Sequence, residues 1–167
     1  MKKIQIFFCA IIALLVSTQI KAQNISTKEA VLSRYYGVKN ALISGDAAAT
    51  KGKAKSLLAA ITSFPADRLS ETDKTTWKKY ADKLQFETRH ISESADIAHQ
   101  REHFGSLSEN MFALLKAVKL NTAMVYRDYC PMKKSYWLSE TATIENPYFG
   151  KQMLTCGAVK ETLSATK

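Results

Sequence analysis

The chain has 167 residues, of which 46% are hydrophobic and 23% are charged, and its formal net charge is +9. This length is sufficient for one domain with its own hydrophobic core. The 24 basic residues are spread along the chain, which indicates a solvated basic surface and argues against a nucleic-acid-binding protein. The sequence has no glycine-rich phosphate loop and no nucleophile elbow, so the enzyme classes defined by those motifs are excluded.

The N-terminal segment has the three parts of a secretory signal peptide: a basic start, an apolar run over residues 4–16 and a polar end. The apolar run is shorter than the roughly 20 residues that cross a bilayer. We therefore predict that residues 1–22 are a signal peptide and that the exported protein resides in the periplasm without a membrane-embedded segment. Loss of Lys2, Lys3 and Lys21 would leave residues 23–167 as one domain of net charge +6, because 9 − 3 = 6.

Apolar residues recur at helical spacing in four successive stretches between Val31 and Val118. Breaks at residues 44–46, 64–65 and 92–96 separate these stretches, and Asp46 and Ser70 are suitable N-cap residues. Four amphipathic helices with short connections predict a mainly α fold, an up-down four-helix bundle with the aromatic and methionine side chains of the stripes in its core.

The pattern changes after Asn121. Residues 124–126 and 136–138 are short β-like runs, residues 146–150 form a turn, and residues 159–163 fit a last helical turn or a strand. We predict that residues 121–163 form a small irregular or short-β lobe, rich in cysteine and methionine, that packs on the bundle.

Four sulfur-containing side chains of this predicted lobe lie on two short segments: Cys130, Met132, Met153 and Cys156. Thiolate and thioether groups are soft ligands that suit Cu(I). Two cysteines in an exported chain also fit a single disulfide. The spacing alone leaves both alternatives open: a Cu(I) site, or a structural or protein-interaction domain with a Cys130–Cys156 disulfide.

A second candidate site is the segment from His99 to His103, in which two histidines four residues apart share one helix face. The segment also matches the inverted zinc-peptidase motif His-x-x-Glu-His, with Glu102 as general base. A peptidase would need a third zinc ligand from a later segment, where the carboxylates are Glu109, Glu140, Glu145 and Glu161. The other interpretation is that His99 and His103 are solvated and bind no metal. We assign no role to His90.

Several segments together resemble a bacterial family of exported domains with a Cys-Pro-Met, Trp-Leu-Ser and Asn-Pro-Tyr-Phe-Gly…Met-Leu-x-Cys-Gly signature. The matching segments are QREHFGSLSENM, VYRDYCPM, YWLSE and IENPYFGKQMLTCG, and the resemblance extends from about Tyr35 to Leu163. Members of that family often have a longer, glycine-containing loop after Cys-Pro-Met, whereas only residues 133–136 intervene here.

The family also occurs on periplasmic adaptors of copper and silver efflux pumps, so the resemblance implies a copper-handling role in the periplasm. Its partners would be the metal ion and an efflux adaptor or metal chaperone. Carried over to this chain, the implied ligands are Cys130, Met132, Met153 and Cys156, with His99 and His103 as weaker candidates. The metal would be copper, as Cu(I), and no catalytic role is implied.

Overall fold

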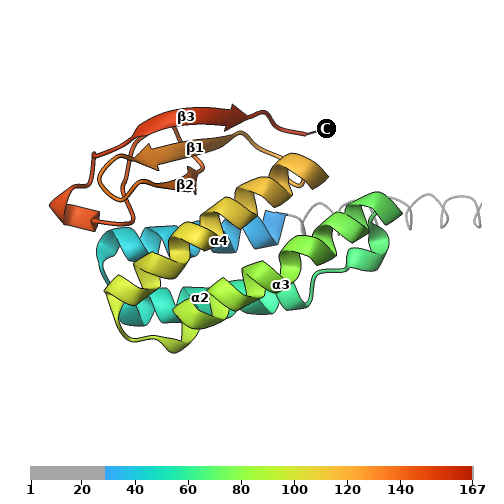
Figure 1. Ribbon diagram of the computed structural model, residues 1–167, viewed down its shortest axis with the longest axis horizontal. Coiled ribbons are helices and arrows are strands. Elements are labelled where there is room, and N and C mark those ends of the chain that lie inside the picture. Colours follow the sequence, from blue (N-terminus) through green and yellow to red (C-terminus); the bar gives the residue numbers. More distant parts are fainter. Residues whose placement is uncertain (1–28, 167) are drawn as a thin grey trace, which may run out of the picture.

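The computed structural model describes residues 29–166, so the predicted signal peptide lies outside the described part. Residues 29–44 are helical and are followed by α2 (Ala47–Thr62), α3 (Glu71–Glu93) and α4 (Ile97–Val118). Figure 1 shows these helices side by side, with consecutive helices running in opposite directions. The prediction of a mainly α bundle is confirmed. Between Glu29 and Thr166 no helix combines the length and apolarity needed to cross a bilayer.

Side-chain caps explain where the helices begin. Asp46 Oδ1 accepts a hydrogen bond from Ala49 N at 2.8 Å, Ser70 Oγ accepts from Asp73 N at 3.2 Å, and Asp96 Oδ1 accepts from Ala98 N at 2.8 Å. Each bond satisfies a backbone N–H that has no partner within the first turn. The same short polar side chains interrupt the apolar pattern of the sequence. The sequence therefore predicts where these helices begin.

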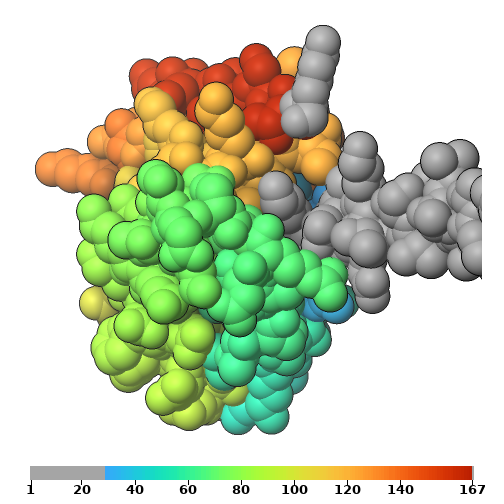
Figure 2. All heavy atoms as spheres, turned by 90° about the vertical axis from the view of Figure 1, so that its right-hand side faces the viewer, coloured from blue at the N-terminus to red at the C-terminus, as the bar shows by residue number. Residues whose placement is uncertain are grey.

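A three-stranded antiparallel sheet follows the helices, with strand order β2-β1-β3. Its strands are β1 (Val125–Cys130), β2 (Ser135–Ser139) and β3 (Ala158–Leu163), and two short 3₁₀ turns cover Ala66–Arg68 and Gly150–Gln152. The sheet lies on the side of the bundle formed by α4 and the first helix (Figure 1). In Figure 2, α3 (green) lies below the sheet. The predicted C-terminal lobe is therefore confirmed, and its last segment is a strand.

Two side chains, one buried and one partly buried, attach this lobe to the helices. Tyr35, which is fully buried, pairs its hydroxyl with Ser108 Oγ at 2.7 Å and accepts a hydrogen bond from Leu138 N at 3.0 Å. Arg101 on α4 donates from Nε to Pro147 O at 3.0 Å and from Nη2 to Leu42 O at 3.1 Å. The lobe, α4 and the first helix thus share polar contacts as well as an apolar core.

Asp128 on β1 is a buried carboxylate, and neither of its oxygens has a hydrogen-bond partner among residues 29–166. Burial raises its pKa to about 6 from 3.8, against smaller lowering effects of Ser139 and Lys39. A raised carboxyl pKa means that the folded state binds the proton more tightly than the unfolded state, so this group destabilises the fold as pH rises from about 4 to about 6.

We therefore expect Asp128→Asn to raise the melting temperature at pH 7.5 by roughly 2–4 °C and to change it little at pH 4. Thermal unfolding followed by circular dichroism at several pH values measures this. Asp82→Asn, an exposed carboxylate on α3, is the matched control and should have almost no effect. Equal pH profiles of the wild type and Asp128→Asn would contradict the assignment.

Candidate metal centre

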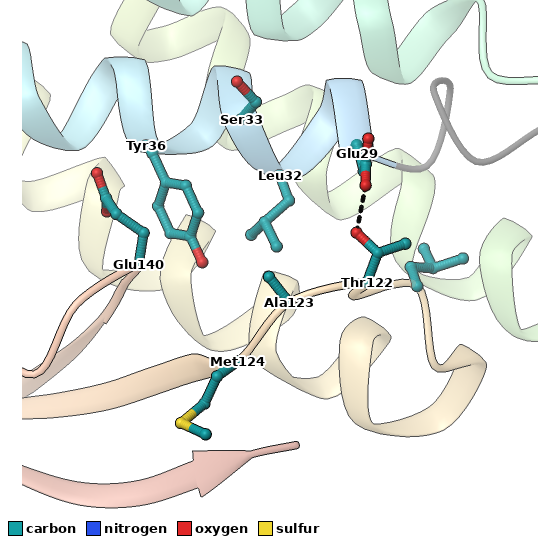
Figure 3. Close-up of a pocket in the computed structure, with 9 residues that line it drawn as sticks. Glu29, Leu32, Ser33, Tyr36, Thr122, Ala123, Met124 and Glu140 are labelled. Carbon is teal, nitrogen blue, oxygen red and sulfur yellow. Dashed lines mark hydrogen bonds between the residues drawn. The ribbon is translucent and has the colours of Figure 1, made fainter. Parts of the chain in front are cut away.

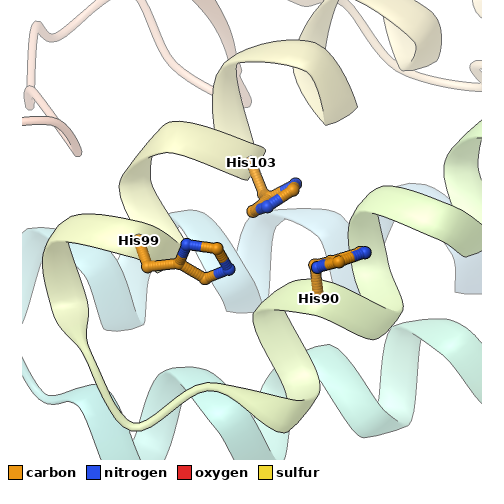
Figure 4. A group of neighbouring side chains, drawn as sticks. All are labelled: His90, His99 and His103. Carbon is orange, nitrogen blue, oxygen red and sulfur yellow. The ribbon is translucent and has the colours of Figure 1, made fainter.

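Three histidine side chains meet on one side of the bundle, between the end of α3 and the start of α4. The candidate ligand atoms of His90, His99 and His103 all lie within 4.8 Å of one another. Figure 4 shows His90 on one helix and His99 and His103 on successive turns of the next, with the three rings turned toward a common space. This group contains His99 and His103 of the sequence prediction and adds His90.

The helical hairpin holds the three histidines together. The four-residue spacing places His99 and His103 on one face of α4, and the short connection from Glu93 to Ile97 folds α4 back against α3. Gln100 on α4 is fully buried, and its Nε2 donates to Ala47 O at 3.0 Å and to Ser94 O at 2.9 Å. These bonds fix the start of α4 to the beginning of the connection and to α2.

Glu87 orients one of the three imidazoles. Its Oε2 lies 2.6 Å from His103 Nδ1, and a carboxylate only accepts, so Nδ1 carries the proton of that bond. His103 Nε2 then keeps its lone pair for a metal ion. A carboxylate on the far nitrogen of a ligand histidine is common at metal sites, because it fixes the tautomer and increases the basicity of the ligand.

The rings are partly exposed and lie against a large exposed aromatic side chain. His90 stacks on His103 with centroids 4.4 Å apart, and His99 meets His103 edge-on at 4.5 Å. Phe86, 56% exposed, lies 4.5 Å from His90 between ring centroids. The group therefore offers three nitrogen ligands from one side and leaves the solvent side open for a fourth.

We expect Glu87→Gln to weaken metal binding by about 10-fold or more, because the neutral amide no longer polarises His103. Competition of the variant and the wild type against a chromophoric chelator measures the change. Glu102→Gln is the matched control: Glu102 precedes His103, is exposed and is not part of the histidine group. An equal loss in both variants would mean that Glu87 contributes only general negative charge.

The two cysteines form a separate, reduced pair in the C-terminal lobe. Both are free thiols, and partial burial and then the adjacent Cys130 thiol raise the pKa of Cys156. Asn146 Nδ2 donates to Cys130 Sγ at 3.1 Å and to Cys156 O at 2.7 Å. The turn at residues 146–150 thus brings the cysteines together, without a disulfide between them.

The methionines of the predicted sulfur site are more exposed than Cys130. Met132 is 63% exposed, in the turn between β1 and β2, and Met153 is half-buried. Cys130 itself is fully buried, and Lys133 N donates to its sulfur at 3.4 Å. No cysteine belongs to the histidine group, so the six predicted ligands do not form one site in the described structure.

The geometry gives little support to a zinc peptidase. Glu102, the predicted general base, lines a hollow with Lys133 and Lys134 and does not belong to the histidine group. Three of the carboxylates considered as a third ligand have other partners: Glu109 binds Arg127, Glu140 binds Lys39 and Glu161 binds Lys116. The third imidazole comes from the preceding helix, a source that the peptidase motif does not include.

His90, Glu87 and Gln100 were not predicted as site residues. The available signal was positional: His90 and Glu87 lie in the last two turns of α3, and His99 and His103 lie in the first two turns of α4. In an antiparallel helix pair with a short connection, such positions face each other. The rotation of each helix decides whether they meet, and periodicity alone does not determine it.

A scan against protein families matches residues 31–123 to the family described as protein of unknown function, DUF3347. Searches of curated proteins and of solved structures gave no match. The matched segment contains His90, His99 and His103 and ends before the two cysteines. Because the match spans more than half of the 167 residues, the chain belongs to the DUF3347 family.

Proposed function

We propose that this protein binds a transition-metal ion through His90, His99 and His103. The observation that carries the proposal is the approach of three imidazoles to within 4.8 Å of one another. Three histidines make a neutral nitrogen site of the kind that holds zinc or copper with one coordination position open. The hydrogen bond between Glu87 and His103 supports the same function, because it prepares one nitrogen to bind the ion.

The metal that we propose is copper. Imidazole ligands suit several divalent ions, and among them copper has the highest intrinsic affinity. The reduced Cys130–Cys156 pair offers a second kind of ligand that favours the monovalent ion. A chain with both kinds of site is suited to copper in either oxidation state.

The setting that we propose is metal handling in the periplasm, with delivery of copper to an efflux adaptor or to a metal chaperone. The N-terminal sequence pattern and the resemblance to domains of copper-pump adaptors support this setting. Partial exposure of all three histidines also supports exchange of the ion with a partner, because an enclosed site would release it slowly.

The test is an equilibrium titration of the purified protein with Cu(II) and with Zn(II), each against a chelator of known affinity. We expect one equivalent of Cu(II) to bind, with loss of binding in the variant His90→Asn/His99→Asn/His103→Asn. Paramagnetic resonance of the bound Cu(II) should show nitrogen hyperfine structure. Stronger binding of Zn(II) than of Cu(II) would overturn the choice of copper, and failure of both ions would overturn the site.

The second candidate is a Cu(I) site at Cys130 and Cys156, with thioether ligation by Met132 and Met153. The observation that favours it is the unbridged contact between the two thiols. We expect the reduced protein to bind Cu(I) under anaerobic conditions in competition with a Cu(I) chelator, and Cys130→Ser/Cys156→Ser to lose this binding. The triple histidine variant is the control and should keep it, whereas an oxidised pair with no free thiol would favour the disulfide alternative.

A further inference from the structure

A small hollow lies at one end of the bundle, where three segments of the chain meet. The segments are the end of the first helix with the turn that follows it, the start of α4, and the second 3₁₀ turn of the C-terminal lobe. The volume of the hollow is about 220 Å³, below that of drug-sized sites, so its occupant is limited to a small molecule. Its apolar walls include Ile43, Ile97 and Phe149, and its charged side chains are Arg101 and Lys151.

Arg101 brings a positive charge into this hollow that no carboxylate neutralises. Its Nε donates to Pro147 O and its Nη2 to Leu42 O, and it forms no ion pair among residues 29–166. Burial lowers the pKa of Arg101, and no acidic side chain opposes this effect. Partial burial of a charge costs free energy, and the two backbone carbonyls carry only partial negative charges. The charge of the guanidinium group is therefore available to a further group.

Part of the Arg101 guanidinium group is also free to donate hydrogen bonds. Of its five N–H groups, the bonds to Pro147 O and Leu42 O use two. The Nη1 atom has no acceptor in the described part of the chain, and protein atoms do not enclose it. A guanidinium group binds a carboxylate through pairs of N–H groups, so the remaining donors suit an anion of this kind.

The lining of the hollow contains a second positive charge and no acidic side chain. Lys151 is exposed. Three acidic residues adjoin lining residues in the sequence, and each has another place. Asp46 and Asp96 cap the backbone N–H groups at the starts of α2 and α4, and Glu102 lines a different hollow. The hollow beside Arg101 is therefore complementary to an anion.

The hollow in Figure 3, between the first helix and the loop after α4, differs in this respect. Its two carboxylates have partners within the protein. Glu140 Oε2 lies 2.7 Å from Nζ of the buried Lys39, and Glu29 accepts a hydrogen bond from the Thr122 hydroxyl, which Figure 3 shows as a dashed line. Arg101, in contrast, has only backbone carbonyls as partners.

We propose that the hollow beside Arg101 binds a small organic anion, a carboxylate group on a short apolar body. The carboxylate accepts hydrogen bonds from Arg101 and is attracted by Lys151. The apolar body packs against Ile43, Ile97 and Phe149. A neutral molecule of the same shape lacks the charge interaction, and a cation is repelled.

The test uses benzoate as the probe, with benzamide and benzamidinium as neutral and cationic analogues of the same planar shape. Binding is followed on the purified metal-free protein by the methyl resonances of its isoleucines. Ile43 and Ile97 line the hollow, and Ile61, buried near the end of α2, is the internal control. We expect benzoate to shift Ile43 and Ile97 saturably and to leave Ile61 unchanged. Benzamide should bind about 10-fold more weakly, and benzamidinium should not bind.

Two variants separate binding from folding. Arg101→Lys keeps the positive charge but loses the planar N–H groups, so it should weaken benzoate by at least about 10-fold. Because Arg101 also holds the lobe, circular dichroism must show that this variant is folded. Lys151→Gln removes an exposed charge, so it should leave the melting temperature unchanged and weaken benzoate about threefold. Lys160→Gln, an exposed lysine on β3, is the matched control and should bind benzoate as the wild type does.

Three results would overturn the proposal. Equal affinity for benzoate, benzamide and benzamidinium would mean that the hollow does not select by charge. Unchanged affinity of Lys151→Gln, or an equal loss in Lys160→Gln, would mean that only the net charge of the protein attracts the anion. A shift of Ile61 as large as those of Ile43 and Ile97 would place the probe elsewhere.

Discussion

Replacement of His103 by alanine is expected to lower the affinity for Cu(II) by at least about 100-fold. His103 stacks on His90, meets His99 edge-on and is the histidine that Glu87 orients. The variant loses one of three nitrogen ligands and leaves Glu87 without its partner. The two remaining imidazoles are on different helices and offer an ion no more than weak bidentate binding.

Two measurements separate this loss from a loss of folding. Circular dichroism of the metal-free variant should be close to that of the wild type, because the His103 side chain is partly exposed. The melting temperature should rise with added Cu(II) in the wild type, since a ligand at 100 times its dissociation constant contributes about 2.7 kcal/mol. His103→Ala should lack this rise, and a rise that persists would place the ion elsewhere.

Replacement of Gly150 by alanine is expected to reduce the free energy of unfolding by about 2–4 kcal/mol. Gly150 has φ +55°, and an added Cβ would lie 2.7 Å from Ile43 O and 3.0 Å from Arg101 Nη2. The first contact is with the backbone of the last turn of the first helix and is not easily relieved. The second displaces Arg101, which bonds Leu42 O and Pro147 O.

Chemical denaturation measures this change, and Gly52→Ala is the matched control. Gly52 is in α2 and has open space where its Cβ would be, so alanine should stabilise the protein by up to about 1 kcal/mol through helix propensity. Both substitutions add one methyl group to the same chain, but they should change the free energy of unfolding in opposite directions. Two changes of the same sign would contradict the packing described around Gly150.

The helices were predictable because their signals are local. Apolar spacing and capping side chains such as Asp46 and Ser70 lie within a few residues of the feature that they determine. The C-terminal strands were only partly predictable, because β3 pairs with β1 across about 30 residues and is largely exposed. Its sequence alone has no strong alternation.

The candidate site was predictable to the extent that it depends on one helix. His99 and His103 share a face by their spacing, whereas the addition of His90 depends on how α3 is rotated against α4. The sequence suggested a link between Cys130 and Cys156 from their number alone, whereas the structure shows that Asn146 joins them through hydrogen bonds to both residues. Cysteine spacing carries no information on whether the sulfurs bond each other or a metal.

The position of the three histidines on both sides of the connection between α3 and α4 has a consequence for the dynamics of this helical hairpin. An ion bound to His90 and to the two α4 histidines would link two helix ends and oppose their separation. Amide hydrogens around residues 93–97 would then exchange with solvent more slowly with metal than without it. The ion itself would stay within reach of a partner on the solvent side, because the three imidazoles are partly exposed.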